Sequence, residues 1–592
     1  MEDGMKIVIC TTPIRPVPTN YPPFGSMALI QSLRMAGYDP YFYDIDGLRP
    51  SFDEVVRFFA DYQPDLIGVS AVVSTAYAYT KTLCCALRCA LPRATIAVGG
   101  NLAASAELLL RRCAVDCCGV GEGERTIVRL AHAVQQGGGG VPRQALGQIK
   151  DLAFLDEAGE MVFTGYDTPI PVGDFLDPDY AILERCSRIS NFITDPLIDR
   201  ADFARDPRTY QPSRRGQKMA TVVATKGCVA RCTFCHRWDK GYRHLPPHRI
   251  IARMQELRDR YNVGFFHFGD ENFGSDRRLL EGLIALIKPM DVLYVVAGVR
   301  CRSVDRELLL RMKESGCVAM YYGMETGSPR MLQVMEKNTT LEQNLQAAQW
   351  TFEAGIQTTY QLVLGMPGET AETIDETTAF VKQVTEPLPE PPTERLSINY
   401  IQALPGTPTY EYARQHGLLG TSLDDEEAYL LRISDTDAGD EMDMLNFTEE
   451  PFLTVQTWRV KMLLEAERHW YRVRGWKRPP ATGPSGRHVE ERNYRTQGGY
   501  FNLRRLFWHP WFYRYGAWLR APFLFCYVLA KDLAQLPPRA VWRHLMEWLT
   551  AQRRTPRRAV PQYRSLGRIV GEQAPPPATL SERSMLPLRA GR

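Results

Sequence analysis

Apolar runs of strand length alternate with helix-length segments in two separate stretches of this chain. In the first stretch, residues 5 to about 135, the apolar runs are Lys6–Cys10, Tyr41–Asp44, Leu66–Ser70 and Thr95–Gly100. Strands separated by helices predict an α/β fold with a doubly wound parallel sheet. Ligands of such sheets bind beyond the carboxyl ends of the strands, so we expect a Rossmann-like binding domain over residues 1–140.

The second alternating stretch begins at the strand Met219–Ala224 and ends at the strand Leu396–Ile401. Its six strands predict a partial (β/α)6 barrel of TIM type over residues 215–435, with its chemistry at the carboxyl ends of the strands. A chain of 592 residues is too long for one core. We therefore expect three further segments: a linker with short strands (141–214), a mainly helical C-terminal domain (436–550) and a disordered basic tail rich in Pro and Arg (551–592).

Three cysteines follow the first strand of the expected barrel on one short loop. Cys228, Cys232 and Cys235 have the spacing C-x3-C-x2-C, and the next cysteine is Cys301. Thiolates are soft ligands that suit zinc or iron–sulfur clusters. Three thiolates on a [4Fe-4S] cubane leave one iron open for a substrate or cosubstrate. The alternative is a non-enzymatic zinc site completed by a nearby histidine, for which the candidates are His236, His244 and His248.

Further motifs accompany the cysteine loop. Gly323-Met-Glu325-Thr-Gly-Ser328, Leu364-Gly-Met-Pro-Gly-Glu-Thr370 and Leu404-Pro-Gly-Thr407 follow it in order. In this order and spacing, residues 215–435 resemble the domain of the radical S-adenosylmethionine (SAM) enzymes. The resemblance implies a [4Fe-4S] cluster whose open iron binds SAM, a 5′-deoxyadenosyl radical, and an electron donor such as flavodoxin or ferredoxin.

The same resemblance implies which residues contact SAM. They are Phe234, beside the adenine, and Asp270, Glu271, Gly323, Glu325 and Gln361 at the strand ends. Other roles stay open for several of them. Asp270 or Glu271 would equally cap the segment that follows, Gln361 and Arg300 would equally support the core, and His267 is expected to be a hydrogen-bonded core residue.

The first alternating stretch carries a second resemblance. Gly68-Val-Ser70, Val98-Gly-Gly100 and Val120-Gly-Glu-Gly-Glu124 occur in the order found in the cobalamin-binding domain that precedes many radical SAM domains. The D-x-H-x-x-G loop of cobalamin-dependent mutases is absent, and no histidine precedes His132, so this domain cannot offer cobalt a histidine. The candidate cobalamin contacts are Ser70, Ser74, Gly99, Gly100, Gly121 and Glu122. The alternative is a Rossmann-like domain that binds nothing.

Together the two resemblances imply a cobalamin-dependent radical SAM methyltransferase. SAM would supply both the radical and, through cobalamin, the methyl group that is placed on an unactivated carbon. The alternative is radical oxidation, cyclisation or rearrangement without methyl transfer. The expected substrate is a small hydrophobic or natural-product molecule, such as a polycyclic lipid or a tetrapyrrole-like pigment precursor.

Charge is unevenly distributed along the chain. From Leu453 to Arg592 there are 26 Lys and Arg against 8 Asp and Glu, and eight of the ten Trp residues lie there. The segment Tyr500–Leu536 is aromatic and basic, and Trp542, Leu545, Met546 and Leu549 form an apolar stripe at helical spacing. This composition favours a peripheral contact with an anionic membrane, although a helical cap on the barrel fits equally well. Nucleic-acid binding is not expected.

The 14 cysteines lack a disulfide-type spacing, and the chain starts directly with a strand, without a signal peptide. We therefore expect reduced thiols and a cytoplasmic location, with the C-terminal segment against the inner face of the cell membrane.

Overall fold

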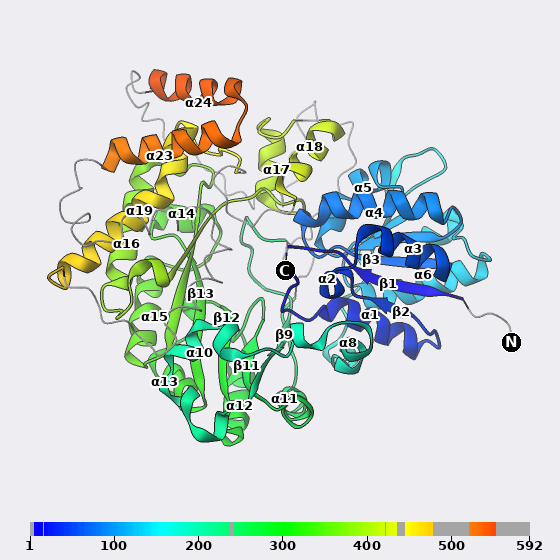
Figure 1. Cartoon of the computed structure of the whole chain (residues 1–592), viewed down its shortest axis with the longest axis horizontal. Helices are drawn as coiled ribbons and strands as arrows, with labels where there is room; N and C mark the ends of the chain where they lie inside the picture. Colours follow the sequence, from blue (N-terminus) through cyan, green and yellow to red (C-terminus); the bar gives the residue numbers. More distant parts are fainter. Residues whose placement is uncertain are drawn as a thin grey trace.

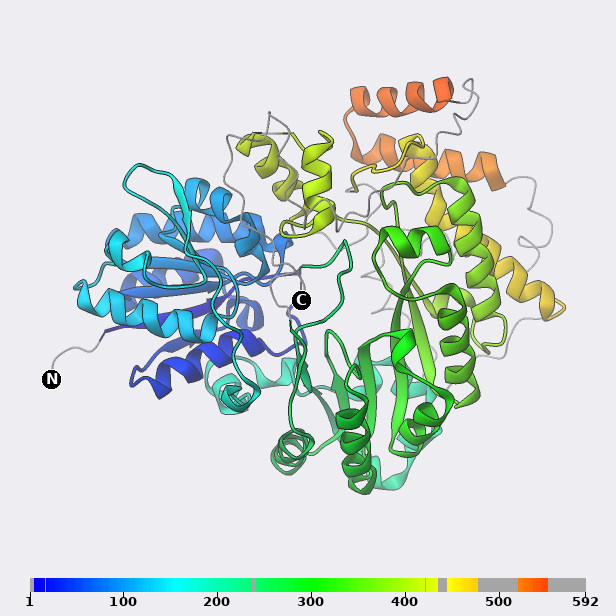
Figure 2. The ribbon, with the colours of Figure 1, turned by 180° about the vertical axis from the view of Figure 1, so that it is seen from behind.

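The computed structural model places two sheet-based units side by side, with a group of C-terminal helices on the outer side of the second unit (Figures 1 and 2). It describes residues 5–15, 17–236, 241–420, 422–434, 444–476 and 520–551. The run Tyr500–Leu536 lies outside these ranges up to residue 519, and the expected disordered tail lies outside them from residue 552.

The N-terminal unit is built on a seven-stranded sheet with the order β2-β1-β3-β4-β5-β6-β7. The first five strands are parallel: β1 (Ile7–Thr11), β2 (Tyr41–Tyr43), β3 (Leu66–Ser70), β4 (Thr95–Gly99) and β5 (Cys117–Gly119). Alternate residues of each strand face opposite sides of a sheet. Ile7 and Ile9 pack under α1 (Phe24–Met35) and α6 (Gly123–Gln136), whereas Val8 and Cys10 pack under α3 (Phe52–Tyr62), α4 (Tyr77–Ala90) and α5 (Ala106–Arg112). Helices on both faces confirm the doubly wound sheet.

The last two strands of this sheet come from the expected linker. β6 (Leu152–Leu155) and β7 (Met161–Phe163) pair antiparallel to β5 and to each other. The N-terminal sheet therefore extends about twenty residues beyond the boundary expected at residue 140. The rest of the expected linker consists of short helices, including α8 (Tyr180–Cys186), α9 (Pro196–Asp199) and α10 (Ala201–Arg205).

The second unit is a half-barrel of six parallel strands in sequence order. They are β8 (Lys218–Val222), β11 (Val263–Phe268), β12 (Leu293–Val299), β13 (Cys317–Glu325), β14 (Gln357–Leu364) and β15 (Leu396–Tyr400). Their outer covering consists of α11 (Pro247–Tyr261), α12 (Arg277–Ile287), α13 (Arg306–Glu314), α15 (Leu341–Glu353) and α16 (Ala371–Thr385). Side chains of Asp276, Asp305 and Thr340 cap the starts of three of these helices. The predicted partial (β/α)6 barrel is confirmed.

The inner face of the half-barrel changes character along its length. Phe203 of α10 packs there against Met219, Phe265, Leu293, Val295 and Ala319, which close the amino end with an apolar plug. Every second residue of a strand lies on the same face. Beyond the plug, this inner face carries polar side chains: the half-buried Tyr321, Thr359, Ser397 and Asn399 and the exposed Gln361. The carboxyl half of the inner face is therefore polar and open to solvent.

Three helices from the C-terminal part of the chain pack on the outside of the barrel. α19 (Phe452–Val473) lies against α16, with Lys382 Nζ 2.7 Å from Glu465 Oε2. The next two helices are α23 (Arg520–Gln535) and α24 (Pro538–Ala551). The buried Asp532 of α23 links both to α19, because it accepts hydrogen bonds from Gln456 Nε2 of α19 (2.9 Å) and His544 Nδ1 of α24 (3.0 Å). Among the described helices, we find none that combines the length and the apolarity needed to span a bilayer.

Candidate active site

The cysteine loop is held at its start by Asp270, which follows β11. One oxygen of Asp270, Oδ1, accepts hydrogen bonds from Ala224 N (2.9 Å), Thr225 N (2.6 Å) and Thr225 Oγ1 (2.6 Å). Burial raises the pKa of this carboxyl to about 6. Within the described part of the chain Oδ2 is buried and makes no hydrogen bond. Asp270 thus holds the start of the cysteine loop, directly after β8, and its second oxygen could accept a hydrogen bond from a ligand.

Both ends of the cysteine loop are paired as a short antiparallel ribbon. β9 (Thr225–Lys226) precedes the cysteines and β10 (Arg243–His244) follows them, with Lys226 opposite Arg243. Inside the loop, Thr233 N donates to Met335 O at 3.0 Å, and Thr409 N donates to Thr233 O at 3.1 Å. Three distant segments of the barrel therefore determine where the three thiols lie.

The three thiols are not yet arranged as a metal cage. Cys232 is buried and hydrogen-bonded to the Cys235 thiol, while Cys228 Sγ accepts from Ala230 N at 3.3 Å. Across the residues that the structure describes, no three His, Cys, Asp or Glu side chains are grouped to hold a metal ion. The hydrogen bond from Cys235, together with the Lys337 ammonium, lowers the pKa of Cys232 and favours its thiolate. Three thiols on one loop beside a cation fit a cluster with thiolate ligands.

A buried ion pair lies against this loop. Glu325, the last residue of β13, has φ +64° and accepts from Lys337 Nζ at 2.6 Å. The same Nζ lies 5.8 Å from the centre of the Phe234 ring. A Cβ on Gly323 would come within 2.5 Å of Glu325 Oε1 and 3.0 Å of Lys337 Nζ, so a larger residue there would make this pair shift. Phe234, Gly323 and Glu325, three of the expected SAM contacts, thus lie close together around Lys337.

Lys337 was not singled out by the sequence. It follows α14 (Pro329–Val334) in a turn where Glu336 and Asn338 both have positive φ. Although burial opposes its charge, Glu325 raises the pKa of Lys337. Arg300 donates to the Lys337 carbonyl. Because Lys337 lies in a turn outside the recognised motifs, the sequence gives no signal that it pairs with Glu325.

The other two expected SAM contacts are more exposed. Glu271 is exposed next to Asp270. Gln361 is exposed on the inner face of β14, in register with Gly323 of β13 and Ser397 of β15. Gln361 therefore lines the open half of the barrel, on the strand next to the Glu325–Lys337 pair.

In the N-terminal domain, four of the candidate cobalamin residues gather at the carboxyl ends of β3 and β4. Ser70 is half-buried and in register with Gly99, where an added Cβ would meet nothing within 4 Å. Ser74 is buried, and its Oγ makes no hydrogen bond within the described residues. Gly100 has φ +89°, and a Cβ there would lie 2.4 Å from Ala71 O, so this glycine shapes the turn itself. An open edge with an unsatisfied hydroxyl fits a bound cofactor.

The remaining two candidates, Gly121 and Glu122, make contacts inside the protein. A Cβ on Gly121 would approach the Asp151 carboxylate to 3.0 Å. Glu122 Oε2 accepts from Ile170 N at 2.6 Å, and Oε1 pairs with Arg243 and lies 3.5 Å from Lys226 Nζ. Although burial opposes this, the Arg243 hydrogen bond and Lys226 lower the pKa of Glu122. Glu122 therefore joins the N-terminal domain to both strands of the β9–β10 ribbon.

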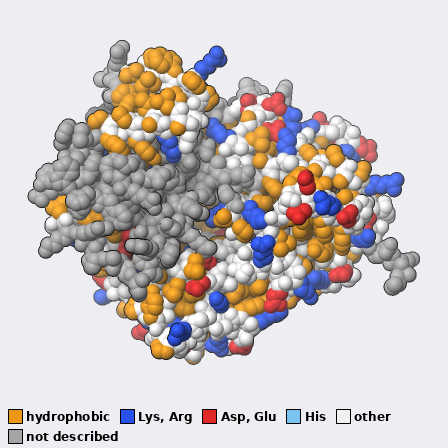
Figure 3. Space-filling view, in the orientation of Figure 1, with side chains coloured by type: hydrophobic (Ala, Val, Ile, Leu, Met, Phe, Trp, Pro, Cys, Tyr) orange, Lys and Arg blue, Asp and Glu red, His pale blue; other side chains and the backbone are white. Residues whose placement is uncertain are grey.

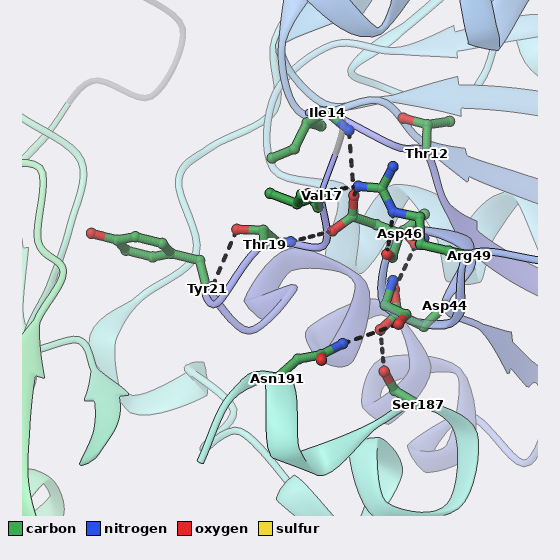
Figure 4. Close-up of polar contacts among 12 residues, drawn as sticks. Thr12, Ile14, Val17, Thr19, Tyr21, Asp44, Asp46, Arg49, Ser187 and Asn191 are labelled. Atoms are coloured by element: carbon green, nitrogen blue, oxygen red, sulfur yellow. Dashed lines mark hydrogen bonds and ion pairs between the residues drawn. The ribbon is translucent and has the colours of Figure 1, made fainter. Parts of the chain in front are cut away.

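The loop after β1 extends from the N-terminal domain to the barrel. Two residues fix this loop: Asp46 accepts a hydrogen bond from Thr19 N at 3.0 Å, and Arg49 donates to Val17 O at 2.9 Å (Figure 4). Tyr21 extends away from this clamp towards the barrel (Figure 4), where its hydroxyl lies 3.4 Å from His267 Nε2 of β11. The carboxyl edge of the N-terminal sheet thus meets the carboxyl ends of the barrel strands.

Comparison with known proteins agrees with this arrangement. Residues 222–381 match the Radical SAM superfamily, and residues 11–131 match the B12 binding domain. The chain is 29% identical over 372 residues to the anaerobic magnesium-protoporphyrin IX monomethyl ester cyclase of Cereibacter sphaeroides, covering 60% of this chain but only 56% of that protein. It is 25% identical to an uncharacterized methyltransferase of Pyrococcus horikoshii, covering 70% of this chain and 85% of the relative.

A solved structure shares the fold. The radical S-adenosylmethionine methyltransferase TsrM from Kitasatospora setae, with cobalamin and a [4Fe-4S] cluster bound, superposes with a TM-score of 0.52 at 18% identity, covering 70% of this chain and 75% of that one.

Residues 222–381 therefore form a radical SAM domain and residues 11–131 a B12-binding domain. The cofactors of these two domains are a [4Fe-4S] cluster, SAM and cobalamin.

Proposed function

We propose that this enzyme methylates an unactivated carbon of a small hydrophobic substrate. The observation that carries the proposal is the meeting of the two carboxyl edges at Tyr21 and His267. A substrate on the open inner face of the half-barrel would lie between the cysteine loop and the edge formed by Ser70 and Gly99. When bound, the cluster and SAM supply a radical and cobalamin supplies a methyl carrier.

The chain's own residues would hold these groups as follows. Cys228, Cys232 and Cys235 would bind the cluster, and Phe234, Glu325 and the free oxygen of Asp270 would position SAM beside it. Ser70, Ser74, Gly99 and Gly100 would line the cobalamin edge. The thiolate-favouring environment of Cys232 and the polar inner face at Gln361 support these roles. An electron donor such as flavodoxin or ferredoxin would reduce the cluster.

A second outcome is favoured by one relative. The Cereibacter sphaeroides protein is named a cyclase, so oxidation or ring closure without methyl transfer is the runner-up for this chain. This second outcome would need the same fold and cofactors in this chain. It would differ from methylation only in what happens to the substrate radical.

Product counting separates the two outcomes. The reconstituted protein is incubated with reductant, methyl-labelled SAM and a solvent extract of a strain lacking the gene. Methyl transfer predicts labelled product together with equal amounts of S-adenosylhomocysteine and 5′-deoxyadenosine. Product with 5′-deoxyadenosine but without S-adenosylhomocysteine would replace methylation by the runner-up.

We also propose that α24 contacts an anionic membrane surface. Trp542 (63% exposed), Met546 (38%) and Leu549 (42%) lie on one helical face with the exposed Arg539 and Arg543. Val541 and His544 face inward instead. Figure 3 shows hydrophobic side chains gathered over α23 and α24. Aromatic and apolar side chains flanked by arginines suit a lipid headgroup region, and a hydrophobic substrate would be reached there.

A further inference from the structure

Arg200 occupies the floor of the polar half of the barrel. It directly precedes α10, whose Phe203 forms the apolar plug. Its Nη2 atom lies 3.1 Å from both ring nitrogens of His267, and its guanidinium carbon lies 5.7 Å from the centre of the Tyr321 ring. The Tyr21 hydroxyl also hydrogen-bonds to it. The guanidinium is thus enclosed by two phenols and an imidazole.

None of these neighbours compensates its charge. Burial, together with the Arg200 cation beside the ring, lowers the pKa of His267 well below its ordinary value, so the ring is neutral. The Asp202 carboxylate attracts the Arg200 cation and helps raise its pKa, but both of its oxygens have other partners: Oδ2 accepts from the Tyr321 hydroxyl, and Oδ1 lies 3.5 Å from Arg395 Nη1. Among the described residues, no carboxylate oxygen lies within 4 Å of the Arg200 guanidinium.

Three other buried arginines of this chain have a carboxylate partner. Arg395 lies 2.9 Å from Glu390, Arg214 lies 2.5 Å from Asp291, and Arg253 pairs with Asp177. A charge withdrawn from water without a partner costs several kcal/mol. An unpaired guanidinium on the inner face of the barrel is suited to an anion that arrives with a ligand.

The site is open towards the solvent side of the barrel. Arg200, Tyr321 and Thr359 are half-buried, and the Tyr21 side chain, which arrives from the other domain, is 41% exposed. The exposed Gln361 lies one step further along the same inner face. A ligand entering between the two carboxyl edges can therefore reach Arg200.

We propose that Arg200, with the hydroxyl of Tyr21, binds an oxyanion of the substrate, a carboxylate or a phosphoryl group. The planar fork of a guanidinium matches both groups and binds them through paired N–H donors. The proposal rests on the proposed function only in taking the barrel interior as the substrate site. It adds that the hydrophobic substrate carries an anionic end, which would fix its orientation.

The test measures binding rather than turnover. The full-length reconstituted protein is titrated calorimetrically at low chloride with benzoate, phenylphosphonate and the neutral benzamide. We expect one or both oxyanions to bind at least tenfold more tightly than benzamide. Arg200→Gln should weaken oxyanion binding at least tenfold, and Tyr21→Phe at least threefold. Arg306→Gln, on the outer face of α13 where Arg306 pairs with Glu353 at 3.2 Å, is the matched control and should change nothing.

Preference for benzoate over phenylphosphonate assigns the site to carboxylates, and the reverse assigns it to phosphoryl groups. Equal binding of benzamide and the oxyanions, or no binding of either oxyanion, overturns the proposal. So does unchanged oxyanion binding in both Arg200→Gln and Tyr21→Phe, or a loss of SAM or hydroxocobalamin binding in Arg200→Gln. Since Tyr21 is a loop residue, its variant keeps the test valid if Arg200→Gln fails to fold. Arg200-dependent binding without methyl transfer would reject the proposed function alone.

Discussion

Tyr21 of the B12-binding domain lies directly over Gly269 of the barrel: a Cβ on Gly269 would come within 2.9 Å of the Tyr21 ring and 3.1 Å of Thr221 Cγ2. Gly269 directly precedes Asp270, the residue that anchors the cysteine loop. A single missing methyl group therefore allows the two domains to meet beside the candidate active site.

Replacing Gly269 by alanine should push the Tyr21 ring off the barrel. We expect a loss of about 1–3 kcal/mol in the free energy of unfolding, which is the usual cost of overpacking. Urea unfolding measures it, and faster proteolysis within residues 12–23 would show which segment moved. Gly282→Ala in α12 is the control, because its Cβ would meet only Pro247 Cγ at 3.6 Å and alanine favours a helix by about 0.5–1 kcal/mol. Equal behaviour of the two variants would contradict the steric role of Gly269.

Changing Cys228, Cys232 or Cys235 to alanine should abolish cluster binding. Iron content, visible charge-transfer absorption and 5′-deoxyadenosine formation after anaerobic reconstitution measure the loss. Cys317→Ala, at a buried barrel cysteine outside the loop, should keep all three signals. A loop variant that retains full iron and activity would exclude that thiol as a ligand.

Removing Lys337 should leave Glu325 as an uncompensated buried charge. We expect Lys337→Met to lower the free energy of unfolding by about 3–5 kcal/mol, and the double change with Glu325→Gln to cost clearly less. Urea titrations of the two single variants and the double variant form the required cycle. Additive losses would mean that the 2.6 Å contact carries no coupling energy.

The stability of the enzyme should fall as the pH rises from about 4.5 to about 8, in part because of Glu369. Burial raises the pKa of this carboxyl from 4.5 to about 8, although Gly365 N and Met366 N donate to it. Between these values the folded state holds a proton that the unfolded state has released, so folding loses free energy as the pH rises. Glu369→Gln keeps an acceptor for both amides and should remove this slope, worth on the order of a few kcal/mol. Parallel pH profiles of unfolding for the two proteins would refute the assignment.

The exposed face of α24 should determine vesicle binding. Full-length protein is expected to float with anionic vesicles at low salt and to release them at high salt, because the attraction of each arginine is about 1 kcal/mol and is screened. Trp542→Ser with Met546→Ser should weaken flotation at least several-fold. Leu310→Ser, at an exposed leucine of α13, is the control. Unchanged flotation of the double variant, or none with wild-type protein, would remove the membrane contact from the proposal.

Much of this architecture follows from local sequence patterns. Apolar runs such as Leu66–Ser70 and the side-chain caps of the barrel helices are set by neighbouring residues, so four strands of the N-terminal sheet and the six strands of the half-barrel could be predicted. The family resemblance gave Phe234, Gly323 and Glu325 as candidate SAM contacts, and in the structure these residues lie close together.

The missed features depend on contacts between distant residues. Tyr21 meets His267 across 246 positions, and Glu122 meets Arg243 across 121, which no local pattern encodes. Glu122 was expected at cobalamin because the motif Val120–Glu124 resembles that of cobalamin-binding domains. In the structure its carboxylate contacts two cations instead. An apolar helical stripe usually faces a core. In α24 packing turns Val541 and His544 inward, and leaves the stripe of Trp542 outward.

The two cations held by Glu122 lie on opposite strands of the ribbon that frames the cysteine loop, and Glu124 lies 2.8 Å from Lys226 as well. We therefore expect iron insertion to depend on a folded N-terminal domain. A graft of the barrel onto a foreign N-terminal domain would place the loop correctly only if acidic residues were supplied at these two positions, and a barrel expressed alone should load iron poorly even with all three cysteines intact.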